Sequence, residues 1–145
     1  MIFRILQIAI PFVWFGAVAA ISFMEAPLKF TAPNITVPLG LGIGQIVFHM
    51  LNRVEIVLCV LLAASVYFGH SAGKMAAMFL GIAAAILAVQ TFGLYPLLDD
   101  RAAAVIAGTA APFSHLHIVY IVTDAAKLVV LAALGVTLIK RNLKM

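Results

Sequence analysis

Residues 43–68, IGQIVFHMLNRVEIVLCVLLAASVYF, form an apolar segment with charged residues in its middle. A transmembrane helix needs about 20 mostly apolar residues, and this segment exceeds that length. It nevertheless carries His49, Asn52, Arg53 and Glu55. An ionisable group at the centre of a membrane helix costs at least ~2.5 kcal/mol, so it is by default a functional hypothesis. The segment therefore predicts both a membrane helix and a polar site within it.

Three further apolar segments accompany this one, at residues 5–24, 75–94 and 113–139. Of the 145 residues, 66% are hydrophobic and 10% are charged, whereas soluble domains have about 45–50% apolar and about 25% charged residues. We therefore predict an all-α integral membrane protein. Residues 1–145 are expected to form one domain, an antiparallel four-helix bundle in the lipid bilayer.

The basic residues predict the orientation of this bundle. Five of them flank the segments on one side: Arg4, Lys74, Lys140, Arg141 and Lys144. The other side, with predicted outer loops at 25–42 and 97–112, carries Lys29, Arg101, Glu25, Asp99 and Asp100. Because cytoplasmic flanks are enriched in lysine and arginine, we expect both termini in the cytoplasm. A bacterial inner (plasma) membrane is the expected location, and no nucleic-acid partner is expected.

Polar residues of the second segment fall near one face of the predicted helix. At about 100° per residue, His49, Asn52 and Arg53 share a face, and Glu55 is displaced from it by roughly a third of a turn. Lipid cannot satisfy such a face. We therefore expect it to point into the bundle.

The fourth segment carries a matching stripe. His117, Tyr120, Asp124 and Lys127 are spaced i, i+3, i+7 and i+10, which places them along one side of a helix. Asp124 and Lys127 could pair with each other, or with Arg53 and Glu55 of the second segment. The first segment contributes Glu25 at its end and the third contributes Gln90, so all four segments place polar groups in the outer half of the membrane.

The preferred functional interpretation is an outward-side site between helices 2 and 4 that binds a metal ion or a small polar ligand. Imidazoles and carboxylates suit iron, copper and zinc, and four-helix bundles hold metals between facing helices. The predicted ligands are His49, His117, Glu55 and Asp124, with a haem between the two histidines as a variant. The residues expected to orient these ligands or balance their charge are Glu25, Asn52, Arg53, Gln90, Tyr120 and Lys127.

Two other interpretations remain open. Two acids and two bases could form a neutral buried network that fixes helix register, in a structural or accessory subunit of a larger membrane complex. Intramembrane acids, histidines and lysines also relay protons in transporters, so a proton-coupled small-solute transporter or a channel subunit is the third interpretation. Four helices are few for an alternating-access carrier, which would then require a homo-oligomer. Whether the chain is an enzyme is left open.

Two short motifs resemble a known family. They are F-x-x-L-H at Phe113, Leu116 and His117, followed by Asp124, and A-P-x-x-F at Ala26, Pro27 and Phe30. These residues are similar to those of a family of small four-span membrane proteins of unknown function that includes the human transmembrane protein 205. The resemblance implies the four-span architecture and a candidate site at His117 and Asp124, where the family often has Asn in place of the aspartate.

Overall fold

The computed structural model describes residues 2–69, 72–111 and 115–143. Nearly all of them are helical, and no strand occurs within these ranges. The predicted all-α class is therefore confirmed. Phe113 of the F-x-x-L-H motif and Lys144 of the basic flank lie outside the described residues.

Four helical segments in the described part of the chain are long and apolar enough to cross a membrane. They are Ile2–Thr31, Val37–Gly69, Gly73–Ile106 and His115–Asn142. Each is longer than the apolar segment predicted at its position, mainly because the helices continue into the stretches expected to be outer loops. The length and composition of these helices therefore indicate an integral membrane protein.

The first spanning segment changes its helical type as it approaches its end. It consists of α1 (Ile2–Val18), the π-helix η1 (Ala19–Glu25), the short α2 (Ala26–Leu28) and the 3₁₀-helix η2 (Lys29–Thr31). Pro27 does not end the segment: it lies at the start of α2, directly after the π-helix η1, where the helical hydrogen-bonding pattern changes. The chain turns only at residues 32–36, where Asn34 has a φ of 65°.

The third spanning segment also contains a π-helix. It consists of α4 (Gly73–Val89), η3 (Gln90–Leu94) and α5 (Tyr95–Ile106), and it ends beside Gly108, which has a φ of 74°. The second and fourth segments are continuous α-helices, α3 (Val37–Gly69) and α6 (His115–Leu143). Single π turns in α-helices frequently occur at functional sites, and both η1 and η3 lie in segments that surround the polar residues described below.

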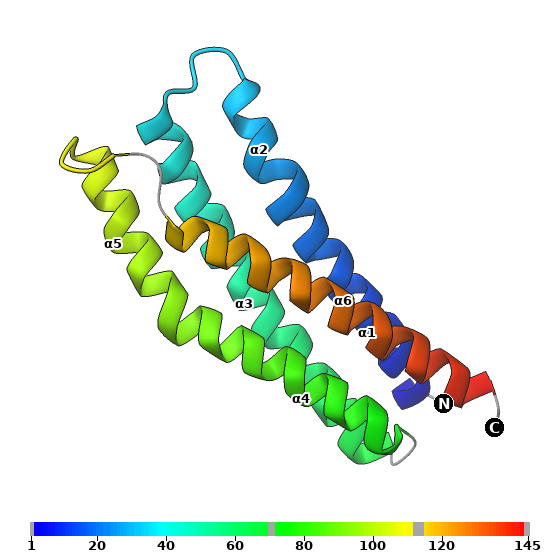
Figure 1. The fold of residues 1–145 in the computed structure, drawn as a ribbon. Helices are drawn as coiled ribbons and strands as arrows, with labels where there is room; N and C mark the ends of the chain where they lie inside the picture. Colours follow the sequence, from blue (N-terminus) through cyan, green and yellow to red (C-terminus); the bar gives the residue numbers. More distant parts are fainter. Residues whose placement is uncertain (1, 70–71, 112–114, 144–145) are drawn as a thin grey trace.

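The spanning segments pack as an antiparallel bundle (Figure 1). α1 packs against α3 and α6, α4 packs against α6, and α5 packs against α3. Both chain termini lie at one end of the bundle, which we call the terminal end (Figure 1). The turn at residues 32–36 and the end of α5 lie at the opposite end, the loop end.

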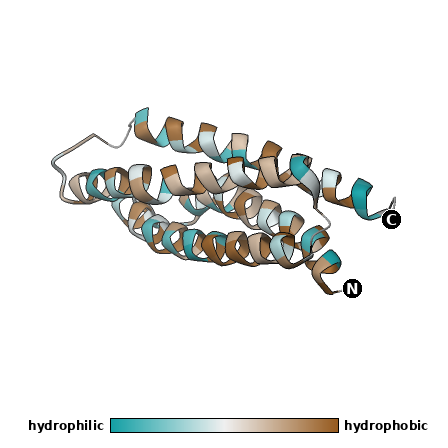
Figure 2. Ribbon diagram, turned by 90° about the horizontal axis from the view of Figure 1, so that it is seen from below, coloured by the Kyte–Doolittle hydropathy of each residue, from teal (hydrophilic) through white to brown (hydrophobic). Residues whose placement is uncertain are grey.

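Apolar residues fill the terminal half of the bundle and also cover its outside. Ile10, Leu62 and Leu134 belong to a buried apolar cluster that reaches the terminal end. Figure 2 shows hydrophobic residues along the length of the long helices. Large apolar side chains on the outside include Phe92, which is 82% exposed, and Ile46, which is 75% exposed. Such a surface suits a lipid environment, in which apolar side chains need no cover.

Candidate functional site

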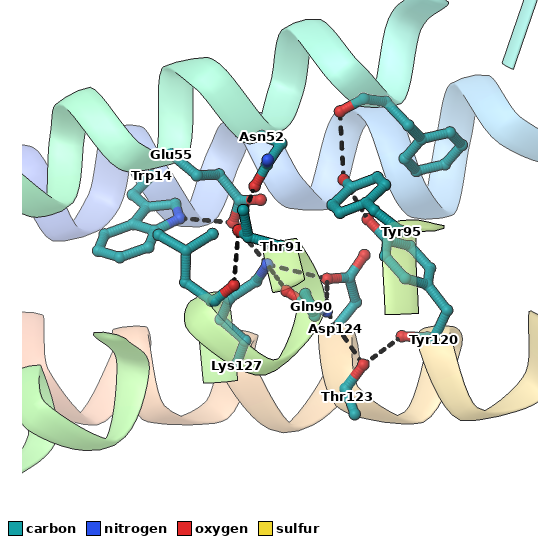
Figure 3. Close-up of polar contacts among 12 residues, drawn as sticks. Trp14, Asn52, Glu55, Gln90, Thr91, Tyr95, Tyr120, Thr123, Asp124 and Lys127 are labelled. Carbon is teal, nitrogen blue, oxygen red and sulfur yellow. Dashed lines mark hydrogen bonds and ion pairs between the residues drawn. The ribbon is translucent and has the colours of Figure 1, made fainter. Parts of the chain in front are cut away.

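Glu55, Asp124 and Lys127 meet in the middle of the bundle, and we call these three residues the charge centre (Figure 3). Glu55 comes from α3, and Asp124 and Lys127 come from neighbouring turns of α6. Lys127 Nζ lies 2.5 Å from Glu55 Oε1 and 3.0 Å from Asp124 Oδ1. All three side chains are fully buried. Burial of an ion pair demands further hydrogen bonds, because the attraction alone does not offset the lost hydration.

Trp14 and Gln90 supply those hydrogen bonds from the other two spanning segments. Trp14 Nε1, on α1, donates to Glu55 Oε1 at 2.7 Å. Lys127 Nζ donates to Gln90 Oε1, on η3, at 2.6 Å. An ammonium group has three hydrogens to donate, and Lys127 faces three acceptors. The charge centre is thus bonded to all four spanning segments.

Gln90 also bonds to Asp124 and to the residue directly before it on α6. Its Nε2 atom donates to Asp124 Oδ1 at 2.8 Å and to Thr123 Oγ1 at 3.0 Å. Gln90 is the first residue of the π-helix η3, and its side chain is fully buried. One side-chain amide therefore contacts the lysine, the aspartate and the threonine.

One oxygen of each carboxylate is not used by these contacts. Glu55 Oε2 and Asp124 Oδ2 are buried and have no hydrogen-bond partner among the described residues. Buried polar atoms in proteins are almost always hydrogen-bonded. Two orphaned oxygens on neighbouring acids therefore require an explanation.

A pocket of about 580 Å³ lies toward the loop end of the bundle, and we call it the loop-end pocket. Residues of η1, α2, η2, α3, α5 and α6 line it, and most of them are apolar. Its lysine, arginine, aspartate, glutamine and histidine residues are Lys29, Arg101, Asp99, Gln45 and His117.

Two glycines let the end of the first segment approach α3 at this pocket. A Cβ atom on Gly40 would collide with the ring of Phe30, and one on Gly44 would lie 3.1 Å from Lys29 Nζ. A Cβ atom on Gly42, between them, would have no atom of a neighbouring element within 4 Å. The close approach therefore depends on Gly40 and Gly44 and not on the glycine content of the helix as such.

The charged residues of the pocket have defined partners. Lys29 Nζ lies 3.3 Å from Glu25 Oε2 and 5.4 Å from the centre of the Phe48 ring. Arg101 Nη2 donates to the carbonyl oxygen of Ala111 at 2.7 Å. These contacts hold two cationic side chains at the pocket wall.

The acid of the pocket, Asp99, is engaged by two residues of α3. Its Oδ1 accepts a hydrogen bond from Gln45 Nε2 at 3.3 Å, and its Oδ2 lies 2.9 Å from His49 Nε2. The His49 ring also stacks against Tyr95, with ring centres 5.6 Å apart. Asp99 is therefore turned toward α3.

Tyr95 and Tyr120 lie to one side of the charge centre (Figure 3), and both also line the loop-end pocket. Their hydroxyl oxygens are 3.1 Å apart, and the Tyr95 hydroxyl also donates to the carbonyl oxygen of Phe48 at 3.1 Å. Both tyrosines are buried. The pair therefore belongs both to the pocket wall and to the surroundings of the charge centre.

The structure does not bring the four predicted metal ligands together. Glu55 and Asp124 lie in the charge centre, but His49 is half-exposed and pairs with Asp99, and His117 lines the pocket. In the described ranges, no three histidine, cysteine, aspartate or glutamate residues form a group that could hold a metal ion. The reason is geometric: Lys127 fills the space between the carboxylates, and the inward face of α3 carries Asn52 and Glu55, not His49.

The residues predicted to surround the metal ligands also lie in different parts of the structure. Asn52, Gln90, Tyr120 and Lys127 are buried inside the bundle, and Asn52 Oδ1 accepts a hydrogen bond from Thr91 at 2.8 Å. Arg53 is exposed on α3, beside His49, and does not belong to the charge centre. Glu25 pairs with Lys29 near the pocket. Lys127 contacts both acids at once, so the two pairings considered for it occur together.

Sequence reasoning missed Trp14 and Thr123. Trp14 is the single tryptophan of the chain and is fully buried. A buried indole N–H usually has a hydrogen-bond partner, and this rule could have linked Trp14 to an acid of another helix. Thr123 offered no such signal, because a threonine in a helix commonly bonds to the backbone of its own preceding turn, as Thr123 does with the carbonyl of Tyr120.

Comparison with known proteins adds no relative: no family model, curated protein or solved structure matches the chain. The resemblance to the transmembrane protein 205 family stays a prediction that rests on the two short motifs.

Proposed function

We propose that this membrane protein binds a small amphipathic anion, with a charged head and an apolar body, in the loop-end pocket. The pocket itself carries the proposal. Ligand sites are typically concave, between about 300 and 1,000 Å³, and mostly apolar, with a few convergent polar groups. The loop-end pocket has a volume of about 580 Å³ and this kind of lining.

The charges of the lining favour an anionic head. Lys29 and Arg101 bring two positive charges to the wall, and Lys29 is paired with Glu25. Asp99 brings one negative charge that is already engaged by Gln45 and His49. A carboxylate or phosphate head would meet Arg101 and would compete with Glu25 for Lys29, whereas an ammonium head would find only acids that already have partners. Phe48, Leu98 and other apolar residues of the wall suit a hydrocarbon body.

The proposal includes the orientation of the bundle. Four basic residues belong to the terminal ends of the helices: Arg4, Lys74, Lys140 and Arg141. The loop end has acids that offset its cations. The positive-inside rule supports cytoplasmic termini, so the pocket would lie toward the outer face, in what we propose is a bacterial inner membrane. The amphipathic anion could then come from the outer leaflet or from the solution outside.

Three fluorescent probes with the same hydrocarbon chain test the proposal: a carboxylic acid, an alcohol and an amine. The purified protein in detergent should bind the acid most tightly and the amine most weakly. Lys29→Gln should weaken binding of the acid by about tenfold, the loss of one favourable charge interaction of about 1.4 kcal/mol, and should change binding of the alcohol little. Equal affinity for all three probes would contradict the proposed selectivity.

A second proposal concerns the charge centre, which we infer also fixes the register of the four spanning segments. Its support is the set of contacts that joins Glu55 and Lys127 to Trp14 and Gln90. A structural or accessory role of the network and ligand binding in the pocket are compatible, because different residues carry them.

A further inference from the structure

The charge centre contains more acids than bases. Glu55 and Asp124 contribute two carboxylates, and Lys127 contributes one ammonium. Within the described part of the chain, Lys127 is the only lysine or arginine that is fully buried. Arg53, the nearest cation along α3, is exposed. With both acids ionised, the charge centre would hold one uncompensated negative charge.

Nothing else that packs against the charge centre removes this charge, as far as the described residues extend. α1 contributes the neutral indole of Trp14, and η3 contributes the neutral amide of Gln90. The other titratable groups near Glu55 and Asp124 are Tyr95, Tyr120 and Cys59, and these can only add negative charge. An isolated charge in an apolar interior is so costly that the group takes up a proton and becomes neutral.

We infer that the charge centre is a proton-binding site that holds one proton on Glu55 or Asp124. The two orphaned oxygens, Glu55 Oε2 and Asp124 Oδ2, support this inference, because each is buried without a hydrogen-bond partner, while the lysine contacts the other oxygen of each acid. A carboxyl group protonated on such an oxygen still accepts the lysine hydrogen bond on its other oxygen. With one proton bound, the three residues are neutral as a group.

A proton suits this site better than a metal cation. Lys127 Nζ contacts Glu55 Oε1, Asp124 Oδ1 and Gln90 Oε1 at 2.5, 3.0 and 2.6 Å. The ammonium thereby occupies the position between the oxygens at which a metal ion would bind. Hard cations such as calcium take at least about six oxygen ligands, whereas a proton needs one. The inference is independent of the proposed ligand, since it concerns a different set of residues.

Infrared spectroscopy of the purified protein in an ester-free detergent tests the inference. A protonated carboxyl group gives a carbonyl-stretch band that shifts in D₂O. An ionised carboxylate does not give this band. At mildly alkaline pH, the wild type should show the band of one carboxyl group. Glu55→Gln and Asp124→Asn should each abolish it, since one acid then balances one lysine. Lys127→Met should double it, since two acids remain without a cation.

Asp99→Asn is the matched control, because it removes an acid outside the charge centre and should leave the band unchanged. A wild-type spectrum without the band would overturn the inference. So would a band that survives in either Glu55→Gln or Asp124→Asn, because the protonated group would not then follow the charge count. A band that appears only when sodium ions are omitted would also overturn it, in favour of an alkali cation. Absence of the band from the wild-type spectrum overturns the inference even where a variant fails to fold.

Discussion

Lys127 is the residue on which the interior of this protein depends most. It is fully buried and contacts two acids and one amide from three different helical elements. A buried ion pair contributes little net stability compared with apolar residues of the same volume, but removal of one partner is costly. The buried ammonium of the lysine therefore allows the two acids to remain inside the bundle.

Replacement of this lysine should be strongly destabilising. We expect Lys127→Ala to lower the free energy of unfolding by about 3–5 kcal/mol, because two acids are left without a buried cation. Reversible unfolding in mixed detergent micelles measures this change. The triple variant Glu55→Gln/Asp124→Asn/Lys127→Met should recover most of the loss. A triple variant that is no more stable than Lys127→Ala would show that the charges are not the cause.

A second prediction for a single residue concerns Trp14. Trp14→Phe keeps an aromatic ring but removes the N–H that donates to Glu55 Oε1 at 2.7 Å. Hydrogen bonds to charged groups contribute about 1.5–3 kcal/mol, and we expect the free energy of unfolding to fall by that amount. In a Glu55→Gln background, the same change should cost less. A double-mutant cycle measures this difference, and equal costs in both backgrounds would contradict the contact.

The sequence predicted part of this site at the residue level. The spacing of Tyr120, Asp124 and Lys127 predicted one stripe on the fourth helix, and all three are buried. His49 was misplaced, because helical periodicity gives the angle between residues but not the direction in which the bundle lies. The inward direction of α3 is set by its apolar residues Leu51 and Leu62 together with Asn52 and Glu55. A single pattern of polar residues could not reveal this.

At the scale of elements, the start of α3 shows how glycines create the pocket wall. Gly40, Gly42 and Gly44 recur at every second position, and two of them face a neighbour whereas one does not. The spacing alone could not show which glycines make the contact. The neighbour, the segment around Lys29 and Phe30, falls in a stretch that the sequence predicted to be a loop, so its packing on α3 could not be foreseen.

This arrangement predicts opposite effects for two matched substitutions. Gly42→Ala should raise the free energy of unfolding by about 0.5–1 kcal/mol, because alanine is the better helix former and its Cβ meets open space. Gly40→Ala should give no such gain and is expected to lower stability, since Phe30 must move. Unfolding of the two variants under the same conditions measures the contrast. Equal effects would contradict the packing of Phe30 on α3.

The π-helices explain why the outer loops were predicted too long. η1 and η3 each precede a proline, Pro27 and Pro96, that lies in the first turn of the next helix. A proline in an apolar pattern normally predicts the end of a helix at the preceding residue. Here the helix type changes before each proline, and the segment continues. Neither composition nor spacing carries a local signal for a π turn.

For the whole molecule, the helical class and the four apolar segments could be predicted from composition and length. An excess of apolar residues indicates a membrane protein, and long apolar segments cross a membrane as helices. The order of packing did not follow from them. It results from contacts between distant residues, such as the hydrogen bond of Gln7 to the Ser65 carbonyl at 2.7 Å. The proposed orientation in the membrane is inferred from the charge distribution alone, and it needs a test of its own.

Cysteine labelling tests that orientation. In a Cys59→Ala background, Asn34→Cys places a thiol in the exposed turn at the loop end, and Lys140→Cys places one at the terminal end. A membrane-impermeant reagent should label the first in intact cells and the second only after the membrane is permeabilised. The reverse pattern would show that the pocket faces the cytoplasm.

The central claim is that the loop-end pocket is a binding site, and one pair of variants tests it most directly. Ala102 is buried in the pocket wall, and the next residue, Ala103, is exposed on the same helix. Binding of the fluorescent carboxylic acid should be measured for the wild type, Ala102→Phe and Ala103→Phe in the same detergent. Binding that is lost in Ala102→Phe and retained in Ala103→Phe is the expected result. Equal affinity in all three proteins, or no binding by the wild type, would contradict the claim.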